Sequence, residues 1–213
     1  MFKKIIVAVL FIVFTFTAPA QTQKVEASDT SVYKEYMLNF KESTYKQNKY
    51  LNKYSDAVVP NSEHGYTVYI APKSGLKAMT KKALNMWYKK TKIKFKVTNN
   101  INSAQIRVYQ AYLDGKFLGI TYFNREQFIK NGPWNMAYAN IDIDKKEIAK
   151  QHDHTAKVLA HEIGHAIGLN HSKDKRSIMY ESDLNDKYSR IIKSDIRIAK
   201  RINHEFCKIA INN

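Results

Sequence analysis

The sequence predicts an α+β domain in which three helices pack against a mixed, twisted sheet of about five strands. Between residues 66 and 144, several segments alternate apolar and polar residues with the period of a strand. Other segments place apolar residues three and four positions apart, as on one face of a helix. The 213 residues suffice for one domain with a sizeable core but not for two full domains.

The strands and helices are expected in a definite order. The segment "YTVYIAP" opens the sheet, and a helix that ends near Lys90 follows it. The apolar stripe of this helix consists of Leu76, Met79, Ala83 and Trp87. Four more strands are expected at 93–97, 104–113, 117–123 and 135–144. The other two helices are expected at about 155–169 and about 193–208.

The first 20 residues have the layout of a secretory signal peptide. Two lysines precede an apolar run from Ile5 to Phe16, and small residues follow at 18–20. Cleavage is expected after Ala20, or as late as Ala27. The alternative is an uncleaved anchor, which is disfavoured because the run is shorter than the roughly 20 residues that cross a bilayer. We therefore expect a secreted, extracellular protein.

Residues 28–63 are predicted to form an N-terminal extension, and a pro-segment is one interpretation of it. The segment is rich in Lys, Asn, Ser and Tyr, and it contains one amphipathic stretch with helical spacing that begins at Val32. Pro60 and the turn-forming "NSEHG" separate this extension from the rest of the chain. The main domain is therefore expected at 64–213.

The formal net charge of +16 indicates an affinity for anionic surfaces. For an exported protein, cell-wall or surface polymers are more plausible partners than nucleic acid, for which no binding motif is present. The alternative is that the lysines only keep the surface soluble. The chain has one cysteine, so no internal disulfide can form, and stability must come from the core or from a bound metal.

The stretch "AHEIGHAIGLNH" at 160–171 predicts a metal site on a helix. His161 and His165 are four residues apart, so they lie on one helical face about one turn, roughly 6 Å, from each other and can bind the same ion. Glu162 is rotated by roughly 100° from His161, close enough to reach a ligand on the metal. A single HExxH match also occurs by chance, but here the apolar positions of the helix and a third histidine extend it.

The third histidine requires the helix to end. In a continued helix His171 would lie about 240° around the axis from His165 and point away from it. Gly168 can adopt the left-handed conformation that ends a helix and turns the chain back. Gly164 lies within the helix, and its missing side chain would allow another element to approach closely.

"HEIGHAIGLNH" followed by "SIMY" resembles the extended zinc-binding motif and Met-turn of the metzincin metallopeptidases. Ser172 and the eight-residue step from His171 to Met179 are most similar to the matrixin branch, the family of the matrix metalloproteinases. The strict match covers 161–180, and a looser match of element order covers about 66–205. The signal peptide and the Lys, Asn and Ile bias indicate a bacterial source.

The resemblance implies a metzincin-like fold in which the active-site helix is followed by the Met-turn and a C-terminal helix. It implies that His161, His165 and His171 bind one catalytic zinc. Glu162 would be the general base and acid, Met179 the apolar floor beneath the metal, and Tyr180 part of the pocket for the residue after the scissile bond. We accordingly expect a monomeric zinc endopeptidase that acts on protein or peptide substrates.

Some features of the family are missing from this sequence, and a calcium site is undecided. No cysteine precedes the motif to block the zinc, so a pro-segment would need another ligand. The candidates are Asp29, Asp56 and His64. The segment "DGKFLG" lacks the residues that hold a second, structural zinc in the family. Calcium remains an option, with Asp142, Asp144 and Glu147 as candidate ligands.

Two other functions compete with the endopeptidase. One is a basic cell-wall or surface-binding protein in which zinc only stabilises the fold, and the other is a hydrolase of peptidoglycan cross-bridges. Glu162 argues against the first, because a structural zinc site has no use for a base. For the enzyme, we expect substrates to pair with the strand at 117–123. Because protons compete for the histidines, we also expect activity to fall below about pH 6.

Overall fold

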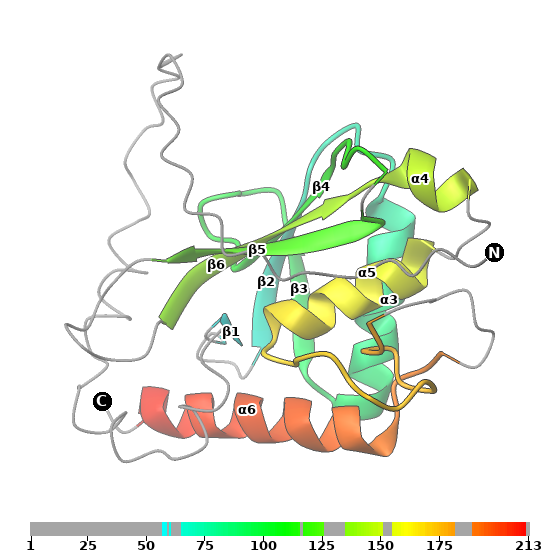
Figure 1. The fold of residues 1–213 in the computed structure, drawn as a ribbon. Coiled ribbons are helices and arrows are strands. Elements are labelled where there is room, and N and C mark those ends of the chain that lie inside the picture. The colour runs from blue at the N-terminus through cyan, green and yellow to red at the C-terminus, as the bar shows by residue number, and fades with distance from the viewer. Residues whose placement is uncertain are drawn as a thin grey trace.

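The computed structural model describes residues 57–58, 60, 65–115, 117–125, 135–150, 155–181 and 189–211. The predicted signal peptide, the predicted helix in the extension and the candidate blocking residues Asp29, Asp56 and His64 lie outside these residues. In the described part, one sheet crosses the molecule and the long helices lie along one side of it (Figure 1).

The sheet is mixed, as predicted. Its strands are β1 (Ala57–Val58), β2 (Gly65–Ile70), β3 (Lys94–Thr98), β4 (Ile106–Gln110), β5 (Gly119–Arg125) and β6 (Asn135–Ile143). The order is β1-β6-β4-β2-β3, and β5 pairs with β6 outside this path. The β5–β6 pair is antiparallel and the other pairs are parallel. All five strands expected from the periodicity are therefore present.

The sixth strand, β1, comes from the segment that was expected to precede the domain. Ala57 and Val58 have no exposed surface, and they pair in register with Asn135 and Met136 at the start of β6. A strand of two residues has no measurable period, so the sequence could not reveal it. The sheet thus begins before residue 64.

Four helices are described, α3 (Lys77–Thr91), α4 (Lys145–Lys150), α5 (Thr155–Ala166) and α6 (Lys193–Ile211). Three of them were predicted, and the short α4 was not. The prediction that Met79 lies on the buried stripe of α3 is wrong, because Met79 is 42% exposed and the neighbouring Thr80 is buried instead. None of the helices in these ranges is long and apolar enough to span a bilayer.

The core lies between the sheet and the paired helices α3 and α5. Val68, Ile106 and Ile141 cover the inner face of the sheet and have no exposed surface. Trp87 of α3 is also fully buried, and its indole nitrogen donates a hydrogen bond of 2.8 Å to the carbonyl of Ala160 in α5. This bond fixes α5, the helix that carries the HExxH motif, against α3.

Candidate metal centre

Helix α5 presents two of the three histidines, and the turn after it presents the third. The helix ends at Ala166, and Gly168 has φ of +99°, a left-handed conformation in which a side chain is strained. The amide of Gly168 donates to the carbonyl of His165, and the amide of Leu169 donates to that of Gly164, both at 2.9 Å. These bonds close the helix and direct the chain back along α5.

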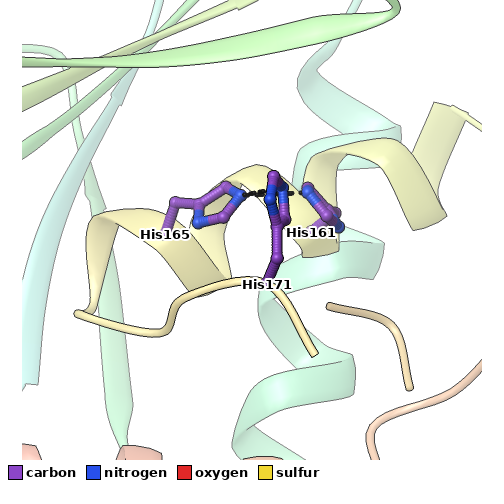
Figure 2. A group of neighbouring side chains, drawn as sticks. All are labelled: His161, His165 and His171. Carbon is purple, nitrogen blue, oxygen red and sulfur yellow. Dashed lines mark hydrogen bonds between the residues drawn. The ribbon is translucent and has the colours of Figure 1, made fainter. Parts of the chain in front are cut away.

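The three imidazoles converge on one point (Figure 2). Nε2 of His165 lies 3.0 Å from Nε2 of His161 and 3.2 Å from Nε2 of His171. His161 is 7% exposed, and His171 lies at the surface. Within the described residues, this is the only group of three or more His, Cys, Asp or Glu side chains that could hold one metal ion.

Backbone carbonyls determine which nitrogen of two rings carries the proton. Nδ1 of His161 lies 2.7 Å from the carbonyl of Ile178, and Nδ1 of His165 lies 2.8 Å from that of Leu169. A carbonyl can only accept, so each Nδ1 carries the hydrogen and each Nε2 presents a lone pair. Burial lowers the pKa of both rings from the ordinary 6.5 to about 4, which keeps them neutral.

This arrangement fits zinc. Tetrahedral ligands at the usual zinc–nitrogen distance of 2.0–2.1 Å lie about 3.3 Å from each other. The separations of 3.0 and 3.2 Å are close to that value. Lone pairs that face each other at such distances repel unless a cation lies between them. Three nitrogen ligands also leave one coordination position open, as in catalytic zinc sites.

Glu162 is buried beside this centre and is held by the edge strand β5. It is 5% exposed, and one carboxylate oxygen, Oε2, accepts a hydrogen bond of 2.6 Å from the hydroxyl of Thr121. Burial raises the pKa of the Glu162 carboxyl, while His165 and the Thr121 hydrogen bond oppose the increase. Thr121 was not identified from the sequence, because nothing in a strand pattern shows which helical residue a threonine will face.

Met179 packs directly against α5 and accounts for Gly164, the first glycine of the motif. Met179 has no exposed surface, and a Cβ placed on Gly164 would overlap its sulfur atom. The expectation that Gly164 allows another element to approach closely is therefore met by Met179. The same added Cβ would lie 3.1 Å from the ring of Trp87, so the position is crowded on two sides.

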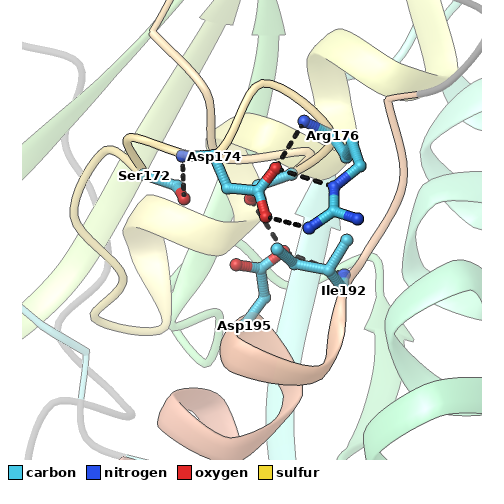
Figure 3. A network of polar contacts seen from close by, with 6 residues as sticks. Ser172, Asp174, Arg176, Ile192 and Asp195 are labelled. Carbon is cyan, nitrogen blue, oxygen red and sulfur yellow. Dashed lines mark hydrogen bonds and ion pairs between the residues drawn. The ribbon is translucent and has the colours of Figure 1, made fainter.

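Polar contacts brace the loop after α5 and the start of α6, as Figure 3 shows for Ser172, Asp174 and Asp195, and further hydrogen bonds hold the turn that contains Met179. The amide of Ser172 donates to the carbonyl of Met179 at 2.7 Å. The hydroxyl of Ser177 accepts from the amide of Met179 at 2.9 Å and donates to Asp195 of α6 at 2.8 Å. Tyr180 is partly exposed, and its backbone amide donates to Ser177. The turn, α6 and the ligand helix thus form one connected unit.

Two of the three candidate calcium ligands, Asp144 and Glu147, have other partners. Both oxygens of Asp144 accept backbone hydrogen bonds, from Leu113 at 2.9 Å and from Glu147 at 3.0 Å, and these bonds lower the pKa of the Asp144 carboxyl. Glu147 forms an ion pair of 2.8 Å with Lys150. Burial raises the pKa of Asp142, which disfavours its charged form. Asp144 therefore acts as the cap of α4.

The fold and this site define a class of protein, namely α+β domains with a three-histidine metal centre on an HExxH helix. The sequence pattern of the family Matrixin matches residues 63–203. The chain therefore belongs to the matrixin family, whose members are zinc-dependent metallopeptidases. The resemblance to the matrixins seen in the sequence is confirmed.

A relative supports the same assignment over part of the chain. A protein of Trichoplusia ni ascovirus 2c, named "Putative matrix metalloproteinase", is 32% identical over 111 residues. The match covers 44% of this chain and 22% of the relative, so the chain spans about a fifth of that protein's length.

We predict that Gly164→Ala destabilises the fold. In an open helical position this change would stabilise by up to about 1 kcal/mol, but here the methyl group meets Met179 and overpacking costs about 1–3 kcal/mol. Denaturant unfolding of both proteins measures the difference. Adding Met179→Ala should make the double variant less destabilised than the sum of the single variants. Additive effects, or a Gly164→Ala protein of unchanged stability, would contradict the crowding.

We predict that the metal-free protein loses stability as the pH falls from about 6.5 towards 4. The folded state keeps His161 and His165 unprotonated down to about pH 4, whereas the unfolded chain protonates them near 6.5. The unfolded state therefore binds more protons in this range, and the free energy of unfolding decreases with acid. Denaturant unfolding of chelator-treated protein at several pH values measures this decrease in the free energy of unfolding.

The control is the double variant His161→Gln/His165→Gln, in which the decrease over this range should be much smaller. Equal pH profiles for the two proteins would show that these rings do not titrate as described.

Proposed function

We propose that the chain is a secreted zinc endopeptidase in which Glu162 serves as the general base and acid. The observation that carries the proposal is a buried carboxylate next to His161 in the chain, close enough to His165 for its charge to be affected, beside three imidazoles that leave one coordination position open. Structural zinc sites usually close all four positions with protein ligands and need no such carboxylate. The placement of Glu162 therefore favours catalysis over a zinc-stabilised binding protein.

His161, His165 and His171 would hold the metal as neutral ligands. Zinc in such a site lowers the pKa of water to about 7 and polarises a peptide carbonyl. Glu162 would take the proton of the attacking water and deliver it to the leaving amine, so no covalent intermediate is needed. The raised pKa of the carboxyl suits a group that must both accept and release a proton near neutral pH.

The substrate would bind along β5. Among the described strands, β5 pairs only with β6, so one edge is available for an extended peptide. Because Thr121 of β5 contacts Glu162, a peptide on this edge lies beside the proposed base. Met179 would support the metal from below, and Tyr180 would line the pocket for the residue after the scissile bond.

The signal-peptide pattern of residues 1–20 supports secretion. The net charge of +16 would favour binding to anionic extracellular polymers, where the enzyme would then act. The same chemistry would serve a hydrolase of peptidoglycan cross-bridges. Cleavage of purified wall without cleavage of a denatured protein would favour that function.

We predict that Glu162→Gln lowers kcat by at least about a hundredfold without loss of zinc. The amide keeps the shape of the side chain but cannot take the proton, and general-base catalysis contributes about 10²–10⁴-fold. The measurements are zinc content and cleavage of casein or gelatin by both proteins.

The matched control is Glu147→Gln, which removes a carboxylate paired with Lys150 on α4, away from the histidines. This variant should cleave like the parent protein. If Glu162→Gln retains full activity, Glu162 is not the base. If neither parent nor variant cleaves any substrate while both bind zinc, the binding-protein alternative gains support.

We predict that cleavage occurs in extended segments with an apolar residue after the scissile bond. Mapping the cleavage sites in a random peptide library by mass spectrometry tests this preference. A library cut without any apolar preference at that position would contradict the role given to the pocket beside Tyr180.

A further inference from the structure

Thr121 lies at the junction between the edge strand and Glu162. Its hydroxyl is 2.6 Å from Oε2 of the Glu162 carboxylate and 3.1 Å from the backbone carbonyl of the same residue. A hydroxyl has one proton to donate, and a carboxylate is a stronger acceptor than a carbonyl. The shorter distance therefore marks the bond to Oε2 as the main one.

The backbone of Thr121 is itself fixed. Thr121 pairs with Ile141 of β6 in the antiparallel ladder, and Ile141 has no exposed surface. The hydroxyl is thus presented from a rigid strand rather than from a loop.

Gly119 lies two residues earlier on the same face of β5, towards α5. A Cβ at Gly119 would lie 3.0 Å from Cγ of Glu162 and 3.0 Å from a methyl group of Val158. The missing side chain allows α5 to approach the strand closely enough for the hydrogen bond between Thr121 and Glu162. Gly119 and Thr121 together confine the Glu162 side chain.

We propose that Thr121 is a positioning residue for the general base, holding Oε2 of Glu162 so that Oε1 is the oxygen that exchanges the proton. This inference rests on the proposed peptidase function. A glutamate side chain has three rotatable bonds, and a fixed partner removes the need to order them during each turnover. Because the substrate would pair with the same strand, β5 would fix the position of the substrate relative to the general base.

A purely structural role for Thr121 makes a different prediction. If the side chain only fills space on the inner face of β5, valine would replace it with little consequence, because valine has nearly the same shape. If the hydroxyl positions Glu162, valine removes the function and serine retains it. The two roles therefore predict different activities for the valine and serine variants.

The test compares Thr121→Val and Thr121→Ser with a matched control, Thr67→Val. Thr67 is on β2, and its hydroxyl donates to the carbonyl of Ser103 at 2.5 Å, so this variant also removes a hydrogen-bonded threonine hydroxyl from the sheet. For each protein, kcat and KM on a fluorogenic peptide, zinc content and thermal unfolding are measured.

We expect Thr121→Val to bind one zinc and to show kcat about ten- to a hundredfold lower with KM changed less than about twofold. Thr121→Ser should recover most of kcat. Thr67→Val should lose thermal stability but keep kcat.

Three kinetic results would overturn the inference, namely an unchanged kcat in Thr121→Val, a kcat that Thr121→Ser does not restore, or an equal loss of kcat in Thr67→Val. A parent protein that cleaves no peptide at all would instead refute the proposed function, and the role of Thr121 would fall with it. Loss of zinc from Thr121→Val alone would also overturn the inference, because it would assign the residue to the metal site.

Discussion

The constraint on which the structure depends is the convergence of three imidazole rings, in which the Nε2 atoms of His161 and His165 lie 3.0 Å apart and neither carries a hydrogen. The facing lone pairs of His161 and His165 repel each other, and the burial of His161 reduces the water that would weaken this repulsion. A zinc ion converts the repulsion into coordination, so metal binding and the stability of this part of the fold are coupled. The carbonyls of Ile178 and Leu169 hold the ring hydrogens of His161 and His165 on Nδ1. The Nε2 atoms of both rings therefore stay available to bind the metal.

Much of the surrounding structure supports those two carbonyls. Ile178 lies in the turn that Ser177 ties to Asp195 at the start of α6, and its own amide donates to the carbonyl of Arg190 at 2.7 Å. Leu169 follows Gly168, whose left-handed conformation ends α5. The C-terminal helix, far from the ligands in sequence, therefore helps to orient His161.

The sequence predicted the parts of this arrangement that depend on local periodicity. The spacing of His161 and His165 places both rings on one helical face, and alternation identified all five longer strands. It could not identify contacts between distant segments, such as Gly164 with Met179 or Thr121 with Glu162. It also failed for Met79, because helical spacing alone does not show which residues beside an apolar stripe a neighbouring element covers.

The most direct test of the account is the coordination of zinc in the purified protein, measured by metal analysis and X-ray absorption at the zinc edge. The account predicts one zinc per chain with three imidazole nitrogens at about 2.0–2.1 Å and one oxygen from solvent. In His171→Ala the nitrogen count should fall to two and the affinity should drop. A site with four protein ligands, or a His171→Ala protein with unchanged coordination, would contradict the central claim.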